Sequence, residues 1–217
     1  MDTLDYVTFD GIPLTALDFY EDLENDNSKG FWTEHKEVYD ESVKAPLTAL
    51  SDELGTRFGA YKMFRPYRDV RFSKDKTPYK THQGVWFGES SMYLQVSAAG
   101  LMLAGGYWHT ESAQVARLRR AIADDVAGPQ FERTVASVRR KGATVGGEQI
   151  TRVPSGYEKD HPRADLLRFK TVTARQELGA PDWLATPRAR GEIAKIWKGM
   201  APLVAWLDTH VGRELQA

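Results

Sequence analysis

Two patterns of apolar residues, one typical of strands and one typical of helices, alternate along the chain. Their order is the strongest constraint on its fold. Residues 85–87 (Val-Trp-Phe) and 93–96 (Tyr-Leu-Gln-Val) are rich in the β-branched and aromatic residues that favour strands. Gly88 and three polar residues separate the two runs, which is typical of a hairpin connection. We therefore predict a β-hairpin here, followed by a third antiparallel strand over residues 101–104.

Apolar residues recur at helical spacing both before and after these strands in the sequence. The predicted helices cover residues 13–24, 31–54, 110–126, 131–141 and 187–211. Residues 165–177 carry a mixed helical and strand pattern, and Pro46 marks either a kink or the first turn of a new helix. Runs of helices around a run of strands predict one α+β domain over residues 1–217. Its antiparallel or mixed sheet is flanked by N-terminal and C-terminal helices.

Composition excludes several classes of site. The 217 residues include no cysteine, which rules out disulfides, thiolate zinc sites, iron–sulfur ligation and a cysteine nucleophile. The acidic start and the lack of an apolar run approaching about 18 residues predict a soluble, cytoplasmic protein without a membrane partner.

The charge is concentrated although the net charge is only -1. Residues 65–80 hold six cations against two aspartates, whereas residues 1–64 hold 5 Lys and Arg against 14 Asp and Glu. The six cations are Arg65, Arg68, Arg71, Lys74, Lys76 and Lys80. Because net charge governs behaviour at a distance, this pattern favours a specific anion site over non-specific adhesion to nucleic acid or membrane.

The residue types in this segment suit recognition of phosphate or carboxylate. Arginine donates two parallel hydrogen bonds to such a group, and lysine adds a compact charge. The hydroxyl groups of Tyr67, Ser73, Thr77 and Tyr79 add neutral donors. Asp69 and Asp75 either orient an arginine, act as a base, or form structural ion pairs with their neighbours, which at a surface contribute about 0–1 kcal/mol.

Histidine spacing predicts no metal site and no cofactor. None of the five histidines lies three to five residues from another, as a helical zinc site requires. His82 and His161 are candidates for acid–base chemistry, because the ordinary pKa of imidazole is near 6.5. The alternative is a hydrogen-bonded or exposed imidazole, with His161 organising a turn with Pro162.

The run from Pro66 to Lys80 resembles the signature of the uncharacterised DUF2461 family. Other pieces match in the same order along nearly the whole chain. They are Asn25 to Asn27 followed by Trp32 and Tyr39, Gly105-Gly106 before a predicted helix, and Asp160-His161-Pro162. The resemblance implies an α+β fold and implies no mechanism.

We therefore predict that the chain binds, and if it is an enzyme acts on, a phosphorylated or otherwise anionic small ligand. The predicted ligand-binding residues are Arg65, Arg68, Arg71, Lys74, Lys76, Tyr79 and Lys80. The candidates for acid–base groups in phosphoryl or phosphoester chemistry are Asp69, Asp75, His82 and His161. Two alternatives stay open: a nucleic-acid binding module, and a structural or partner-binding protein whose basic segment is ion-paired internally with the acidic helices of residues 13–54.

Overall fold

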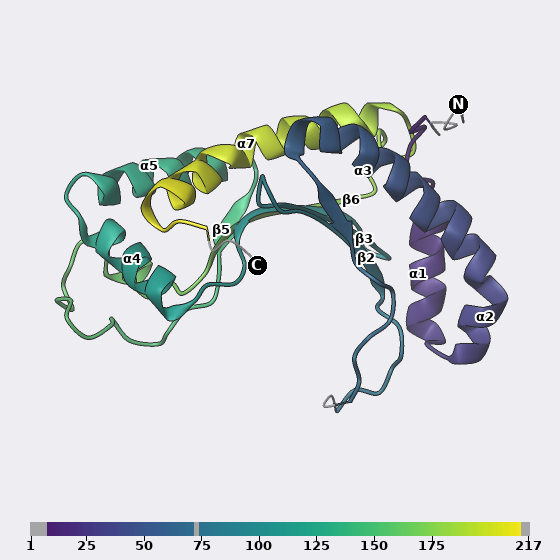
Figure 1. Cartoon of the computed structure of the whole chain (residues 1–217), viewed down its shortest axis with the longest axis horizontal. Coiled ribbons are helices and arrows are strands. Elements are labelled where there is room, and N and C mark those ends of the chain that lie inside the picture. The colour runs from purple at the N-terminus through teal and green to yellow at the C-terminus, as the bar shows by residue number, and fades with distance from the viewer. Residues whose placement is uncertain (1–7, 72–73, 214–217) are drawn as a thin grey trace. The chain divides into compact units, whose positions relative to one another are not determined.

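The computed structural model describes residues 8–71 and 74–213 (Figure 1). Phe72 and Ser73 of the basic segment lie outside the described residues. The chain groups into two compact units. The first unit is Met1–Leu103 with Glu177–Lys195, and the second is Ala104–Gln176 with Ile196–Ala217. We describe each unit by itself, and the single-domain expectation stays a prediction.

Six strands form one sheet in the order β1-β2-β3-β4-β6-β5, which confirms the α+β class. Their bounds are β1 (Tyr61–Met63), β2 (His82–Phe87), β3 (Met92–Ser97), β4 (Gly100–Tyr107), β5 (Thr144–Gly146) and β6 (Val172–Gly179). The β1–β2, β2–β3 and β5–β6 pairs are antiparallel. The predicted hairpin is confirmed as β2 and β3, and the third predicted strand is β4. The mixed segment separates into a short helix, α6 (Ala164–Leu167), and strand β6.

The helices of the first unit are α1 (Thr15–Asn25), α2 (Lys29–Val38) and α3 (Ala45–Phe58), and a π-helical stretch, η1 (Tyr39–Lys44), joins α2 to α3. Pro46 lies in the first turn of α3, one of the two alternatives predicted for it. Proline has no amide hydrogen to donate, so it is tolerated there. The amide of Ala45, just before Pro46, donates a hydrogen bond to the carbonyl of Asp40. This spacing of five residues is that of a π-helix.

Strands β2 and β3 show opposite burial on their two faces. Val85, Phe87, Leu94 and Val96 are completely buried. The alternate residues form what we call the open face, made up of His82, Gly84, Trp86, Tyr93, Gln95 and Ser97. On that face all but Gly84 are only half-buried, whereas helices α1 and α3 cover the other face (Figure 1).

The second unit contains α4 (Ser112–Ala123), α5 (Ala127–Arg140) and α6, and the helix α7 (Arg188–His210) continues into it through Pro202. The predicted N-cap of helix α4 is Thr110, and the observed N-cap is Glu111, one residue later. Glu111 and Gln114 form a capping box, while the hydroxyl of Thr110 donates to the Lys170 carbonyl at 2.8 Å. Within residues 8–71 and 74–213, no helix is long and apolar enough to cross a membrane. The cytoplasmic location stays a prediction.

Replacement of Gly100 by alanine is expected to lower the free energy of unfolding by more than about 2 kcal/mol. Gly100 has φ +96°, and a Cβ there would lie 2.2 Å from the carbonyl carbon of Gly179. Gly191→Ala is the control, because Gly191 lies exposed inside α7 with no such neighbour within 4 Å. The control should raise stability by about 0.5–1 kcal/mol. Urea unfolding of both variants measures the difference, and equal stabilities would contradict this reading of β4.

Candidate functional site

The basic segment continues the β1–β2 pair outward from the sheet. We call residues 64–81 the basic hairpin (Figure 1). Tyr67 and Tyr79 form an antiparallel bridge between its two arms. The Arg68 amide donates to the Pro78 carbonyl, and the Lys80 amide donates to the Pro66 carbonyl, both at 2.8 Å. Each of these two residue pairs keeps one of the two bonds of a regular ladder, because proline cannot donate the second.

Asn27 holds the basic hairpin against the first unit through the backbone of Tyr79. Its side-chain oxygen accepts from the Tyr79 amide at 3.0 Å, and its amide nitrogen donates to the Tyr79 carbonyl at 3.1 Å. The primary amide therefore binds Tyr79 as the peptide group of a neighbouring strand would. The Tyr79 ring, 5% exposed, stacks on Trp32 of α2 with ring centroids 4.3 Å apart and planes 8° apart. These are the contacts of an anchor, and a ligand-binding role for Tyr79 stays a prediction.

Two of the predicted arginines have carboxylate partners inside the basic hairpin. Arg71 makes a two-point pair with Asp69, with Nε–Oδ1 at 2.9 Å and Nη2–Oδ2 at 2.7 Å. Arg68 Nη1 lies 2.5 Å from Asp75 Oδ2 and 2.5 Å from the hydroxyl oxygen of Thr77. Asp69 and Arg71 lie on the same arm of the hairpin. The pair of Arg68 and Asp75 joins the two arms.

The two predicted bases at this end are held in their ionised forms. The amide and then the hydroxyl of Thr77, followed by Arg68, lower the pKa of Asp75 to about 2. Hydrogen bonds from Arg71 lower the pKa of Asp69. A carboxylate with so low a pKa is a weak proton acceptor at neutral pH, which favours a positioning role for Asp75 over a catalytic one.

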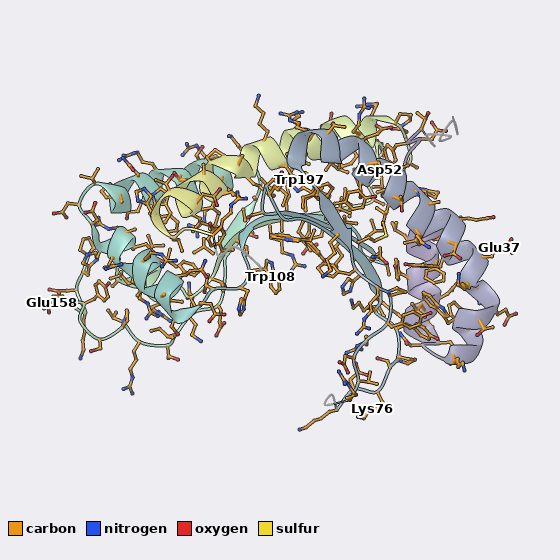
Figure 2. The ribbon with its side chains drawn as sticks, viewed as in Figure 1. Glu37, Asp52, Lys76, Trp108, Glu158 and Trp197 are labelled. Carbon is orange, nitrogen blue, oxygen red and sulfur yellow. The ribbon has the colours of Figure 1, made fainter. Side chains whose placement is uncertain are left out.

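The far end of the basic hairpin also carries two predicted lysines. Lys76 Nζ donates to the carbonyl of Val70 at 2.9 Å. Lys74 is exposed and makes no hydrogen bond or ion pair with the residues that the structure describes. Figure 2 shows Lys76 well away from the sheet, so Lys76 lies apart from the cations nearer the sheet.

Nearer the sheet, four basic residues gather into what we call the cation cluster: Arg65, Arg68, Lys80 and His82. Lys80 Nζ donates to the Arg65 carbonyl at 2.9 Å. Burial and then the charge of Arg65 lower the pKa of Lys80. Burial, followed by the charges of Lys80 and Arg68, lowers the pKa of His82 below its ordinary 6.5. Among the described residues, neither Arg65 nor Lys80 forms an ion pair with a carboxylate. The charge of Arg65 does contribute to the lowered pKa of Asp69.

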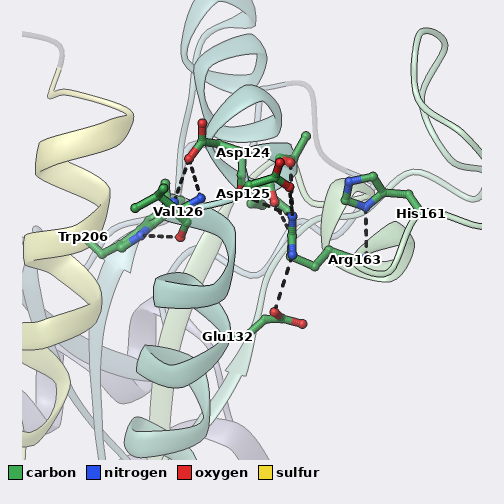
Figure 3. A network of polar contacts seen from close by, with 10 residues as sticks. Asp124, Asp125, Val126, Glu132, His161, Arg163 and Trp206 are labelled. Atoms are coloured by element: carbon green, nitrogen blue, oxygen red, sulfur yellow. Dashed lines mark hydrogen bonds and ion pairs between the residues drawn. The ribbon is translucent and has the colours of Figure 1, made fainter.

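His161 belongs to the second unit and organises a turn. Its Nδ1 accepts from the Arg163 amide at 3.0 Å, and Arg163 is only 8% exposed (Figure 3). The guanidinium of Arg163 donates to the carbonyls of Ile122, Ala123 and Asp124 at 2.6, 3.1 and 3.3 Å. Arg163 thus satisfies the carbonyl groups at the end of α4. We did not predict this role; its sequence signal is the Asp160-His161-Pro162 run directly before it.

A cavity of about 930 Å³ in the first unit lies along η1, α3 and β1. Its charged lining residues include Lys44 and three acids, Asp40, Asp52 and Glu53, and its described lining includes no residue of the basic hairpin. Burial raises the pKa of Tyr61, whose hydroxyl donates to Asp52 at 2.7 Å, to about 12. An acidic lining repels anions, so this cavity suits the predicted ligand less well than the cation cluster does.

Potential metal ligands are scattered in this chain. In the described ranges 8–71 and 74–213, no group of three or more His, Asp or Glu side chains is arranged to hold a metal ion.

One comparison with known proteins relates this chain to others. A family model described as "Conserved hypothetical protein (DUF2461)" matches residues 15–206, which confirms the resemblance over most of the chain. No curated protein and no solved structure matches. The matched range includes the whole basic hairpin and both of its anchors, Asn27 and Trp32.

Asn27→Ala is expected to lower the free energy of opening the basic hairpin by about 1–3 kcal/mol, since two hydrogen bonds are lost. Hydrogen exchange of the Tyr79 amide measures this directly. Asn25→Ala is the matched control, because Asn25 makes one exposed bond to the Glu21 carbonyl at 3.0 Å. The control should leave exchange at Tyr79 within about threefold of the parent. Equal exchange in both variants would show that Asn27 does not anchor the hairpin.

Proposed function

We propose that this chain, which belongs to the DUF2461 family, binds a phosphate-bearing or similarly anionic small ligand at the cation cluster. The observation that carries the proposal is the gathering of Arg65, Arg68 and Lys80 beside half-buried His82. Arg68 has a carboxylate partner in Asp75, but Arg65 and Lys80 have no ion-paired carboxylate among the described residues. Such a group of like charges has the electrostatics of an anion site.

The energetics of the cluster support this proposal. Burial, and after it the charges of neighbouring cations, lowers the pKa values of Lys80 and His82, so the charged forms of both groups cost free energy here. A bound anion would offset that cost, because each positive charge then gains an opposite partner. Arg68 is held in place by Asp75 and Thr77, so little side-chain entropy would be lost when it binds the ligand.

His82 is the candidate for proton transfer that lies closest to such a ligand. With its pKa below 6.5, the imidazole is mostly neutral at pH 7 and is able to accept a proton. Should the ligand also be a substrate, a neutral His82 would suit a general base in phosphoryl or phosphoester chemistry. The carboxylates Asp69 and Asp75 would then position the arginines rather than transfer protons.

The binding test uses inorganic phosphate and pyrophosphate in isothermal titration at low ionic strength. The double variant Arg65→Gln, Lys80→Gln should weaken binding of pyrophosphate by at least about tenfold, since each charge-assisted hydrogen bond contributes about 1.5–3 kcal/mol. The control Lys36→Gln, Lys195→Gln removes the same charge from α2 and α7 and should bind within about twofold of the parent. Absent binding by the parent, or equal weakening in both double variants, would refute the proposal.

Binding should also strengthen as the pH falls from 7.5 to 5.5. A bound anion favours protonated His82, so it raises a pKa that burial, Lys80 and Arg68 lower in the free protein. Protons are therefore taken up on binding, and affinity rises as the pH falls through this window. Sulfate is the suitable probe because it keeps its double charge throughout. His82→Gln should remove the pH dependence while leaving sulfate binding at pH 7.5 nearly unchanged. A pH dependence retained in His82→Gln would count against the assignment.

A further inference from the structure

We infer that the ligand of the cation cluster carries a planar aromatic ring, as a nucleotide does, and that this ring stacks on the open face beside the cluster. This inference rests on the proposed function and narrows its ligand class. It begins from the aromatic side chains of the open face, none of which belongs to the predicted basic segment.

Phe64 and Tyr93 form an aromatic surface on the open face. Their ring centroids lie 6.4 Å apart with the planes tilted by 52°. The Tyr93 ring also lies against the backbone of the neighbouring strand at Gly84. A Cβ at Gly84 would come within 2.3 Å of the Tyr93 hydroxyl oxygen and 2.9 Å of two ring carbons. The absence of a side chain at Gly84 is therefore what lets the half-buried Tyr93 ring lie close to the sheet.

The cation cluster and the aromatic surface are continuous. Lys80 Nζ lies 5.4 Å from the centroid of the Phe64 ring, and Lys62 Nζ lies 5.9 Å from it. Lys80 therefore belongs to both, because it is a member of the cluster and also contacts Phe64 through a cation–π interaction. A ligand held at Lys80 by its anionic group has an aromatic surface within immediate reach.

The spacing of the two parts suits one small molecule. His82 and Gly84 lie on the same face of β2, two residues apart, which separates them by roughly 7 Å. The sugar of a nucleotide separates its phosphate from its base by a similar length. An anionic group at His82 and Lys80 would thus place an attached ring against the Tyr93 ring, which itself lies over Gly84.

Polar groups at the edge of the aromatic surface offer hydrogen bonds to ring heteroatoms. Gln95 lies directly across from Gly84, and its Oε1 accepts from the Tyr93 hydroxyl at 3.1 Å. The amide nitrogen of Gln95 retains donors, because the described residues provide no acceptor for it. Ser97 lies across from His82 and adds a hydroxyl. A lining of aromatic side chains with a few polar groups at its edge is typical of ligand sites.

The distribution of charge favours a small ligand over a strand of nucleic acid. A protein that binds single strands lines a long groove with cations so that they follow successive phosphates. Here the cations that contact the aromatic surface, Lys80 and Lys62, both lie at Phe64, and the whole chain has a net charge of -1. One phosphate group and one ring match this arrangement.

The test compares three probes in isothermal titration: adenosine monophosphate, ribose 5-phosphate and an oligonucleotide of eight thymidines. We expect adenosine monophosphate to bind at least about tenfold more tightly than ribose 5-phosphate, since stacking on an aromatic side chain is the added interaction. Equal affinities for these two would overturn the inference and leave the proposed anion site intact. Binding of neither, together with no binding of pyrophosphate, would instead refute the proposed function. An oligonucleotide that binds more than tenfold more tightly than the mononucleotide would also overturn the inference, in favour of a nucleic-acid interface.

Variants locate the stacking surface. Tyr93→Leu should reduce the preference for adenosine monophosphate over ribose 5-phosphate to less than threefold, with ribose 5-phosphate binding unchanged. Tyr157→Leu is the matched control, because Tyr157 is a half-buried tyrosine of the second unit, and it should keep the full preference. If Tyr93→Leu does not fold, Phe64→Leu serves the same purpose. A full preference retained by the folded variant would overturn the assignment of the ring to this face.

Discussion

The pairing of the Asn27 side chain with the backbone of Tyr79 is the contact on which the rest of the site depends. The basic hairpin leaves the sheet after Met63 and returns at His82, and its own ladder is thinned by two prolines. Asn27 supplies the bonds of a neighbouring strand, and Trp32 supplies a stacked ring. Together they fix the outgoing and returning arms, so that Arg65, Lys80 and His82 remain close despite their mutual repulsion.

The positions of its carboxylates give the two ends of the basic hairpin different electrostatics. Toward the far end, Asp69 pairs with Arg71, and Asp75 pairs with Arg68 of the cation cluster; hydrogen bonds lower the pKa values of both aspartates. Near the sheet, burial and then the charges of neighbouring cations lower the pKa values of Lys80 and His82. The far end is thus braced by internal ion pairs, whereas Arg65 and Lys80 near the sheet have no ion-paired carboxylate among the described residues.

Local sequence patterns predicted much of this fold, and contacts between distant residues account for what they missed. Alternating apolar residues located β2 and β3, and helical spacing located α1, α3, α4, α5 and α7. The two patterns overlapped in residues 165–177, where α6 ends only a few residues before β6 begins. The concentration of positive charge in residues 65–80 identified Arg65, Arg68 and Lys80 of the candidate site. The clamp from Asn27 lies 52 residues from Tyr79, and the aromatic surface joins Phe64 to Tyr93, so neither follows from spacing along one segment.

Pro66 and Pro78 reduce the number of backbone hydrogen bonds that hold the two arms of the basic hairpin together. A ladder with one bond per pair opens at less cost than the full ladder of β2 and β3, whose side chains are buried on the helix-covered face. The arm can therefore open while β2 and β3 stay paired, once its contacts to Asn27 and Trp32 are released.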